Sequence, residues 1–284
     1  METFETYRPL LFSIAYLMLG SVMEAEDMVQ ESFIRWQSAD TSTVTNPKAY
    51  LSSIVTRLCL DKLKSAQTQR EQYIGEWLPE PYLVSNDTPS EMSELADSLS
   101  IAFLHMLERL SPVERAILLL RDVFAYEYSE IATIVDKSEA ACRQALRRAR
   151  QHVAADRPRF DTSQDEQAML LMQFNQACLT GNMEQLLTTL ADDIVSYSDG
   201  GGKVNAARKP IIGSDKVARF LFGLMKLQTD SMTTQFSMAN NMPALIIYEN
   251  GSPYAVMFYH IEGGKIQRIY NVVNPDKLAH LPKM

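Results

Sequence analysis

Residues 110–151 read LSPVERAILLLRDVFAYEYSEIATIVDKSEAACRQALRRARQ, and the local signals in this stretch predict consecutive helices. The first helix is expected to begin at Ser111, Pro112 and Glu114. A serine caps the helix, a proline suits its first turn, and a glutamate three residues after the cap completes a capping box. The apolar residues that follow, up to about Asp122, have helical spacing.

The second half of this stretch predicts two more helices with a short turn between them. Ser129 and Ser138 are expected to cap them, and residues 136–137 form the turn. The result is a helix-turn-helix whose last helix is basic, which suits the DNA major groove. A solvated surface helix is the alternative interpretation. The outward residues expected to contact DNA are Ser138, Glu139, Arg143, Gln144, Arg147 and Arg148.

Composition limits the class of protein. The chain has 284 residues, 46% of them hydrophobic, which is typical of a globular protein. No apolar run approaches the roughly 20 residues of a membrane span, and the N-terminus lacks the pattern of a signal peptide. The three cysteines are far apart and the histidines form no ligand pair, so we expect no metal and no cofactor. We expect a cytoplasmic protein without a membrane partner.

Charge is distributed unevenly, although the net charge is −8. Residues 48–70 contain five basic residues and one acidic residue, and residues 137–159 contain seven basic and two acidic residues. Between them, residues 71–97 contain seven acidic residues and no basic one. Basic helices can pair with phosphates. The acidic segment could repel DNA, cover the basic faces, or simply be solvated.

Pattern and charge together divide the chain into four parts. Residues 1–70 are expected to be helical, residues 71–97 form an acidic linker with prolines, and residues 98–160 contain the helix-turn-helix. Residues 161–284 begin with two helices and continue as short β-rich runs with one more helix after residue 214. The predicted fold class is therefore multidomain, with two all-α domains followed by an α+β domain.

Two segments of the first part contain a second signal. AEDMVQESFIRW (25–36) has an acidic and polar face beside an apolar stripe. NPKAYLSSIVTRLCLDKLKSA (46–66) is basic and has a tyrosine near its start, a combination that suits a strand with unstacked bases. Each feature alone is also typical of an ordinary amphipathic helix.

The order and spacing of these segments resemble bacterial sigma factors of the extracytoplasmic-function group, over residues 1–156. The resemblance implies binding to core RNA polymerase and to promoter DNA. It assigns polymerase binding to Asp27, Gln30 and Glu31. It assigns binding of the −10 element to Lys48, Tyr50, Arg57, Lys62 and Lys64. It assigns binding of the −35 element to the outward residues of the second helix of the helix-turn-helix, named above. Many members have Asn where Arg57 stands, so no base contact is carried over there.

The remainder resembles the SnoaL-like domain, a relative of the ketosteroid isomerase and nuclear transport factor fold, with a curved sheet and a cone-shaped pocket. Three short motifs here are WLPEP (77–81), DGGGK (199–203) and NPDKL (274–278). They are similar to those of a subgroup of sigma factors that has this domain at its C-terminus. The resemblance implies that the domain contacts the sigma core and linker and controls activity in place of a separate anti-sigma factor. The regulatory residues it implies are Trp77, Leu78, Pro79, Asp199, Gly200, Gly201, Gly202, Lys203, Asn274, Pro275, Asp276, Lys277 and Leu278.

Two other functions stay open at this point. One is a ligand-responsive helix-turn-helix repressor, with a small molecule in the C-terminal pocket. The other is an isomerase-like enzyme with a DNA-binding front half. Isomerase chemistry needs a carboxylate base in an apolar pocket, and Asp199 in a glycine-rich turn is poorly placed for it. The other candidates are Tyr197, Tyr259, His260 and Tyr270. We predict no catalytic residue.

Overall fold

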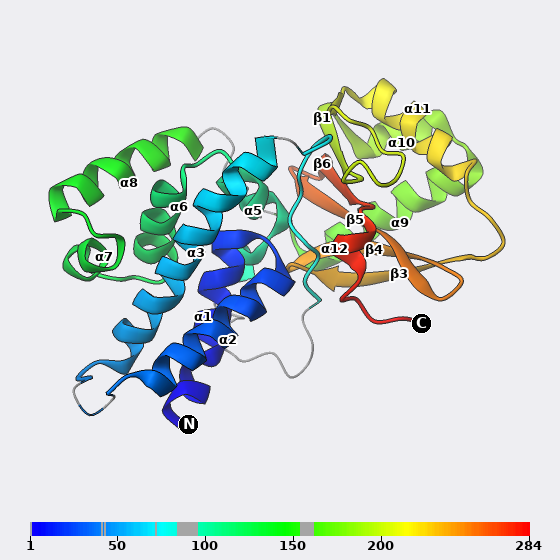
Figure 1. The fold of residues 1–284 in the computed structure, drawn as a ribbon. Helices are drawn as coiled ribbons and strands as arrows, with labels where there is room; N and C mark the ends of the chain where they lie inside the picture. The colour runs from blue at the N-terminus through cyan, green and yellow to red at the C-terminus, as the bar shows by residue number, and fades with distance from the viewer. Residues whose placement is uncertain (1, 41, 43, 72, 84–95, 154–161) are drawn as a thin grey trace. The chain divides into compact units, whose positions relative to one another are not determined.

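The computed structural model describes residues 2–40, 42, 44–71, 73–83, 96–153 and 162–284. The chain divides into two compact units (Figure 1). One, called here the helical unit, consists of Met1–Gln72 and Ser85–Arg157. The other, called the α+β unit, consists of Tyr73–Val84 and Pro158–Met284. The first half of the linker therefore belongs with the C-terminal part of the chain.

Part of the predicted organisation lies outside the described residues. Residues 84–95 contain Asp87, Glu91 and Glu94 of the acidic run, and residues 154–161 contain the expected boundary near Phe160.

The helical unit contains all the helices expected for the front half. They are α1 (Glu2–Leu19), α2 (Val22–Ser38), α3 (Pro47–Glu71), η2 (Ala96–Leu99), α5 (Ile101–Leu107), α6 (Pro112–Leu118), the π-helical turn η3 (Leu119–Val123), α7 (Tyr128–Val135) and α8 (Glu139–Val153). Helix α1 packs against α2 and α3, and α3 also packs against α6 and α7. The two halves of the sigma-like region thus share one packed unit.

The helix-turn-helix forms largely as the sequence predicts. Ser111 and Glu114 make the capping box of α6. Asp136 adopts a left-handed conformation in the turn, with φ 53°, and the Ser138 hydroxyl accepts the amide of Ala141 at 3.2 Å. The expected cap at Ser129 is wrong. Helix α7 begins at Tyr128, two residues earlier than a cap at Ser129 implies. Glu127 caps it together with the Glu130 side chain, which accepts the Glu127 amide.

A buried arginine joins the helices at the centre of the helical unit. Arg115 is 2% exposed and donates to the carbonyl oxygens of Met18 and Leu107. Its guanidinium also forms an ion pair of 2.7 Å with Glu108. Because a buried guanidinium needs partners, these contacts fix α6 against α1 and α5.

The α+β unit contains a six-stranded sheet with the order β2-β1-β6-β5-β4-β3. Its elements are α9 (Gln164–Thr180), α10 (Met183–Thr189), β1 (Leu190–Asp199), β2 (Ile211–Ile212), α11 (Ser214–Met225), β3 (Met232–Ala239), β4 (Met242–Glu249), β5 (Ser252–Glu262), β6 (Lys265–Val272) and α12 (Pro275–Leu278). Strands β1 and β6 are parallel, and the other pairs are antiparallel.

The two faces of this sheet have different covers. Helices α9, α10 and α11 lie over one face and bury its apolar side chains, including Ile194, Tyr259 and Ile269 (Figure 1). The alternate residues of β1 face the other way, toward the extended segment 73–83 and α12. The sequence analysis did not predict strand β3. This strand lies at the edge of the sheet with most of its side chains exposed, so it lacks the regular alternation of apolar and polar residues that indicates a half-buried strand.

Among the described residues, no helix combines the length and the apolar character that a membrane crossing requires.

Candidate functional site

The carboxylate of Asp199, at the end of β1, is the centre of a polar cluster on the sheet face opposite the helices. It accepts the Tyr73 hydroxyl at 2.5 Å and the Leu78 amide at 2.8 Å. It also forms an ion pair of 2.7 Å with Lys277 and accepts the Gly201 amide at 3.0 Å. We call Tyr73, Leu78, Asp199, Asn274 and Lys277 the Asp199 cluster. It joins the linker to the end of β1 and to α12.

Lys277 lies between the linker and the sheet. Its ammonium bonds both the Asp199 carboxylate and the Leu78 carbonyl oxygen. The same ammonium lies 3.9 Å from the centre of the Trp77 ring, a cation–π contact. Asp199 is 0% exposed and the Lys277 side chain 8%. Because both ions are buried, loss of either one would leave the other charge without compensation and would destabilise the fold.

The Tyr73 hydroxyl connects the Asp199 cluster to Asn274. It accepts the Asn274 amide at 2.9 Å while donating to Asp199. Burial and then the hydrogen bond to Asp199 raise the pKa of Tyr73 far above its usual range. Loss of the phenolic proton is therefore disfavoured, and the proton stays in the hydrogen bond to Asp199.

Close approach explains the glycines that follow Asp199. A Cβ at Gly201, where φ is +58°, would lie 2.3 Å from the Asn274 side-chain nitrogen. A Cβ at Gly202 would lie 2.9 Å from Ile74 in the linker. Both positions have left-handed backbone and no room for a side chain, so the glycines let this turn contact the linker and the start of α12.

The rest of the linker continues along the same unit. The backbone amide of Tyr82 donates to the side-chain oxygen of Asn240 at 2.8 Å. The backbone amide of Asn240 donates to the Tyr82 carbonyl oxygen, also at 2.8 Å. Leu83 bridges Ala239 at the end of β3. The His280 ring lies 2.7 Å from the Pro81 carbonyl oxygen. The residues from Tyr73 to Leu83 are thus fixed at several points.

The structure brings most of the predicted regulatory residues together. Trp77, Leu78, Asp199, Gly201, Gly202, Asn274 and Lys277 meet in or beside the Asp199 cluster. Lys203 instead forms an exposed ion pair with Asp276, and Pro275 begins α12. The sequence analysis missed Tyr73, Asn240 and His280. Only the position of Tyr73, four residues before Trp77, could have suggested its role.

Two arginines on the basic face of the helix-turn-helix form ion pairs with carboxylates of the same unit. Arg143 pairs with Glu139 at 2.7 Å, and Arg148 pairs with Glu114 at 3.3 Å. Ser138, Gln144 and Arg147 are exposed on the same helix. Pairs of this kind are weak in water, so a phosphate can replace the carboxylate at little cost.

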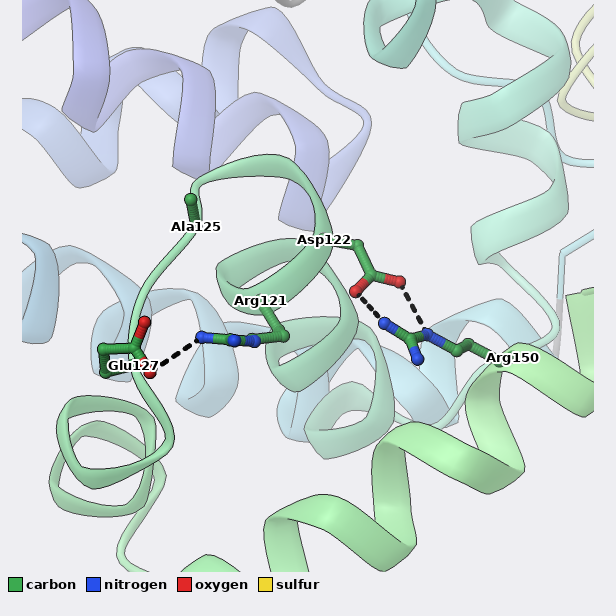
Figure 2. A pocket seen from close by; sticks show the side chains of 5 residues that line it. All are labelled: Arg121, Asp122, Ala125, Glu127 and Arg150. Carbon is green, nitrogen blue, oxygen red and sulfur yellow. Dashed lines mark hydrogen bonds and ion pairs between the residues drawn. The ribbon is translucent and has the colours of Figure 1, made fainter.

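A charged hollow of about 470 Å³ lies beside this face (Figure 2). Arg121 pairs with Glu127 and Arg150 with Asp122, from the π-helical turn, α8 and the loop before α7. The hydrogen bonds that Arg150 donates to the Asp122 carboxylate raise the pKa of Arg150. The centre of the Tyr128 ring lies 4.9 Å from the guanidinium carbon of Arg121 and 4.8 Å from that of Arg143. These contacts fix the start of α7 against α8.

The residues expected at the −10 element lie on α3 but have different neighbours. Arg57 donates to the Thr133 and Ile134 carbonyls at 2.7 and 3.1 Å, at the C-terminal end of α7. Lys62 pairs with Glu24, and Lys64 with Asp61. The Lys48 ammonium lies 5.7 Å from the Tyr126 ring, and the ring of Tyr50 lies 5.9 Å from that of Trp36. Several of these side chains thus contact other helices of the same unit.

The residues expected to bind polymerase share one side of α2. Asp27 and Gln30 are exposed, and Glu31 forms an ion pair of 3.0 Å with Arg35. The opposite side of α2 is buried through Ala25, Val29 and Trp36. The acidic side is therefore available to a partner.

Helices of this order and a helix-turn-helix define a sigma-type transcription factor, and comparisons with known proteins agree. The family model of sigma-70 region 2 matches residues 3–69, and that of sigma-70 region 4 matches residues 100–153. The ECF RNA polymerase sigma factor SigJ of Mycobacterium tuberculosis is 34% identical, over 99% of this chain and 94% of SigJ. A probable sigma factor of the same organism, SigI, is 31% identical over 97% of this chain and 93% of its own.

The fold agrees as well. The crystal structure of SigJ matches 99% of both chains with a TM-score of 0.80 and 31% identity. The chain belongs to the extracytoplasmic-function sigma factors, and it has the fused C-terminal domain that this similarity spans. The predicted fold class is confirmed, with helical sigma regions and an α+β domain after them.

Family membership decides between the functions that the sequence left open. The protein is an alternative sigma factor that directs transcription initiation, and it acts by binding and not by catalysis. The repressor and the isomerase-like enzyme are set aside. Consistent with this, Asp199, Tyr197 and Tyr270 lie on the sheet face away from the helices, separate from Tyr259.

Proposed function

We propose that this sigma factor is controlled by its own α+β unit, which fixes the linker between the two promoter-binding regions. The observation that supports this is the Asp199 cluster, where one buried carboxylate holds Tyr73 and Leu78 of the linker and Lys277 of α12. A separate anti-sigma factor is then unnecessary, because the regulating domain is part of the same chain.

Each region keeps the partner that family membership suggests. The side of α2 with Asp27, Gln30 and Glu31 binds core RNA polymerase in the bacterial cytoplasm. Helix α3, with Lys48, Tyr50, Arg57, Lys62 and Lys64, meets the −10 element. Helix α8, with Ser138, Glu139, Arg143, Gln144, Arg147 and Arg148, meets the −35 element. The last of these proposals is supported by the burial pattern of α8, whose polar residues are all exposed except the half-buried Glu139.

The packing inside the helical unit supports a closed arrangement. Arg57 on α3 bonds the end of α7, and the Tyr126 hydroxyl donates to Ser52 on α3 at 2.6 Å. The −10 and −35 elements lie about 25 base pairs apart, or roughly 85 Å along B-DNA. A unit in which α3 packs on α7 cannot contact both elements at once, so promoter binding requires these helices to separate.

Linker length makes the control quantitative. The 24 residues 72–95 can extend to roughly 80 Å at ~3.3 Å per residue. Fixing residues 73–83 leaves the 12 residues 84–95, which extend to roughly 40 Å. Holding the linker therefore removes about half of the linker residues whose conformation could change when the two regions separate.

Run-off transcription with purified core RNA polymerase tests this proposal. The full chain is compared with Asp199→Asn, which leaves Lys277 without its counter-ion, and with a chain ending at Phe160. We expect promoter-specific transcript yield to change by about tenfold in both variants, which corresponds to ~1.4 kcal/mol between closed and open arrangements. The control is Asp193→Asn, an exposed carboxylate of the same strand. Yields that equal the full chain in both variants would overturn the proposal.

A further inference from the structure

Strand β3 forms a long edge of the six-stranded sheet in the α+β unit. Of the two edge strands, β2 has two residues and β3 has eight. In the described part of the chain, β3 pairs with β4 along its whole length, and on its outer side Leu83 bridges Ala239 at one end (Figure 1). The rest of its outer side has no described strand beside it, so β3 can accept another strand there.

Strand β3 lacks the features that usually protect an edge. Natural edge strands are short, contain charged residues, prolines or bulges, or are covered by another segment. The sequence of β3, MTTQFSMA (232–239), has no charged residue and no proline, and its register with β4 has no bulge. Side chains on both of its faces are exposed, including Phe236 at 49% and Met238 at 44%. An unprotected edge with exposed apolar side chains indicates a strand partner.

The pattern of the β3–β4 ladder decides which backbone groups point outward. The Asn250 amide donates to the carbonyl oxygen of Ser231, which precedes β3, so the odd-numbered residues of β3 bond β4. The even-numbered residues turn their N–H and C=O groups outward, and the Asn240 amide, which donates to the linker, follows the same rule. Among the described residues, none bonds the outward groups of Thr234 and Phe236.

We propose that β3 pairs antiparallel with β3 of a second copy of this chain and forms a symmetric dimer. Two arguments select a second copy as the partner. A strand without charge can pair with itself without placing like charges opposite each other. Pairing of the two β3 edges also leaves only the two-residue β2 at either end of the joined sheet, so the assembly closes as a dimer.

The two ends of β3 decide the register of this pairing. The strand begins at Met232, and Leu83 already lies beside it just beyond Met238. The longest antiparallel pairing of this stretch with its own copy therefore extends over residues 232–238. Its centre is Gln235, which lies opposite Gln235 of the second copy. Any other symmetric register pairs fewer residues.

This register matches both the outward backbone groups and the side chains. Thr234 lies opposite Phe236 of the second copy, so their outward N–H and C=O groups exchange hydrogen bonds. A β-branched residue opposite an aromatic residue also stabilises a sheet. Beside the edge, the Thr233 hydroxyl donates to the sulfur of the 67% exposed Met284 at 3.4 Å, which adds apolar surface. Because the paired stretch is short, we expect a weak dimer with a dissociation constant on the order of 10 µM.

Sedimentation velocity of the full chain over about 1–100 µM, a range around the expected dissociation constant, tests the pairing. Gln235→Lys and Gln235→Glu each place two like charges opposite each other, and we expect each variant to dimerise at least about tenfold more weakly. An equimolar mixture of the two variants places opposite charges together and is expected to dimerise as well as the unchanged chain. Charges are normal at exposed edge positions, so both variants are expected to fold. Gln176→Lys, at an exposed glutamine of α9, is the control.

A cysteine at the centre of the register tests the geometry of the dimer. The three native cysteines are buried, so they contribute little background. Opposite residues that exchange no hydrogen bonds have Cα atoms about 4.5 Å apart, which a disulfide can span. We expect Gln235→Cys to form a covalent dimer on mild oxidation. Asp193→Cys, at an exposed position of β1, is expected to stay monomeric under the same conditions.

Three results would overturn the proposal. The first is a chain that stays monomeric up to about 100 µM, as pairing of β3 within the same chain would cause. The second is dimerisation that neither single charge variant weakens, and the third is equal cross-linking of Gln235→Cys and Asp193→Cys. The control of the linker is tested separately by Asp199→Asn, so failure of either proposal leaves the other standing.

Discussion

The basic face of the helix-turn-helix and the Asp199 cluster both depend on ion pairs, but their surroundings are opposite. The Arg143–Glu139 and Arg148–Glu114 pairs have their arginines more than half exposed, whereas Asp199 and Lys277 are almost completely buried. Exposed pairs contribute little and exchange partners easily, whereas a buried pair is costly to break. The same chemistry can therefore form a contact that holds the linker and, in the proposed function, a surface whose arginines exchange carboxylates for DNA phosphates.

Removing one ion of the buried pair gives the largest expected effect. Lys277→Met leaves the Asp199 carboxylate buried without its cation and is expected to cost about 3–5 kcal/mol of stability. The chain has two tryptophans, Trp36 in the helical unit and Trp77 beside Lys277. Urea denaturation in a Trp36→Phe background therefore reports on the α+β unit.

The double variant Asp199→Asn, Lys277→Met is the control for this prediction. It removes both charges, so it is expected to be more stable than Lys277→Met alone. A loss below about 1 kcal/mol for the single variant would mean that the pair behaves like the exposed ones.

A methyl group at Gly201 tests the packing of the cluster without changing a charge. Gly201→Ala places a Cβ against Asn274 at a left-handed backbone position, and we expect a loss of about 1–3 kcal/mol in the same denaturation assay. Gly223→Ala in α11 is the matched control, because its Cβ meets nothing within 4 Å. The control is expected to be neutral or slightly stabilising. Equal effects at both positions would contradict the close approach.

The contacts of Arg57 are intermediate between the exposed ion pairs and the buried Asp199–Lys277 pair. Arg57 is an exposed residue, but its hydrogen bonds satisfy the carbonyls at the end of α7. Arg57→Ala is expected to destabilise the helical unit by about 1 kcal/mol, measured by Trp36 fluorescence in a Trp77→Phe background. Arg35→Ala removes only an exposed pair with Glu31 and is expected to stay within about 0.5 kcal/mol. If the two variants unfold alike, α3 and α7 are not held together by Arg57.

The smallest expected effect concerns pH. Burial alone would raise the pKa of Glu114, but hydrogen bonds from Ser111 and Arg148 outweigh it and lower the pKa. Its contribution is therefore present above the pKa of the unfolded chain, near 4.3, and is lost as pH falls through the lower folded pKa. The stability difference between the protein and Glu114→Gln is expected to shrink between about pH 5 and pH 3. A difference that grows over this range would contradict the direction of the shift.

The sequence by itself determined the elements whose signals are local. Ser111, Pro112 and Glu114 cap α6 as expected, Asp136 forms the turn, and Gly181 and Asn182 separate α9 from α10. Each of these signals acts within a few residues and survives in any tertiary context. Competition between neighbouring caps explains the wrong assignment of Ser129, because Glu127 forms its capping box two residues earlier.

The Asp199 cluster was decided by tertiary structure. Its motifs were visible in the sequence, but Leu78 and Lys277 are 199 positions apart, and no local rule shows that both reach one carboxylate. Tyr73, Asn240 and His280 were missed for the same reason. Burial and partners are properties of the packed chain, and they alone turn these residues into a contact or a site.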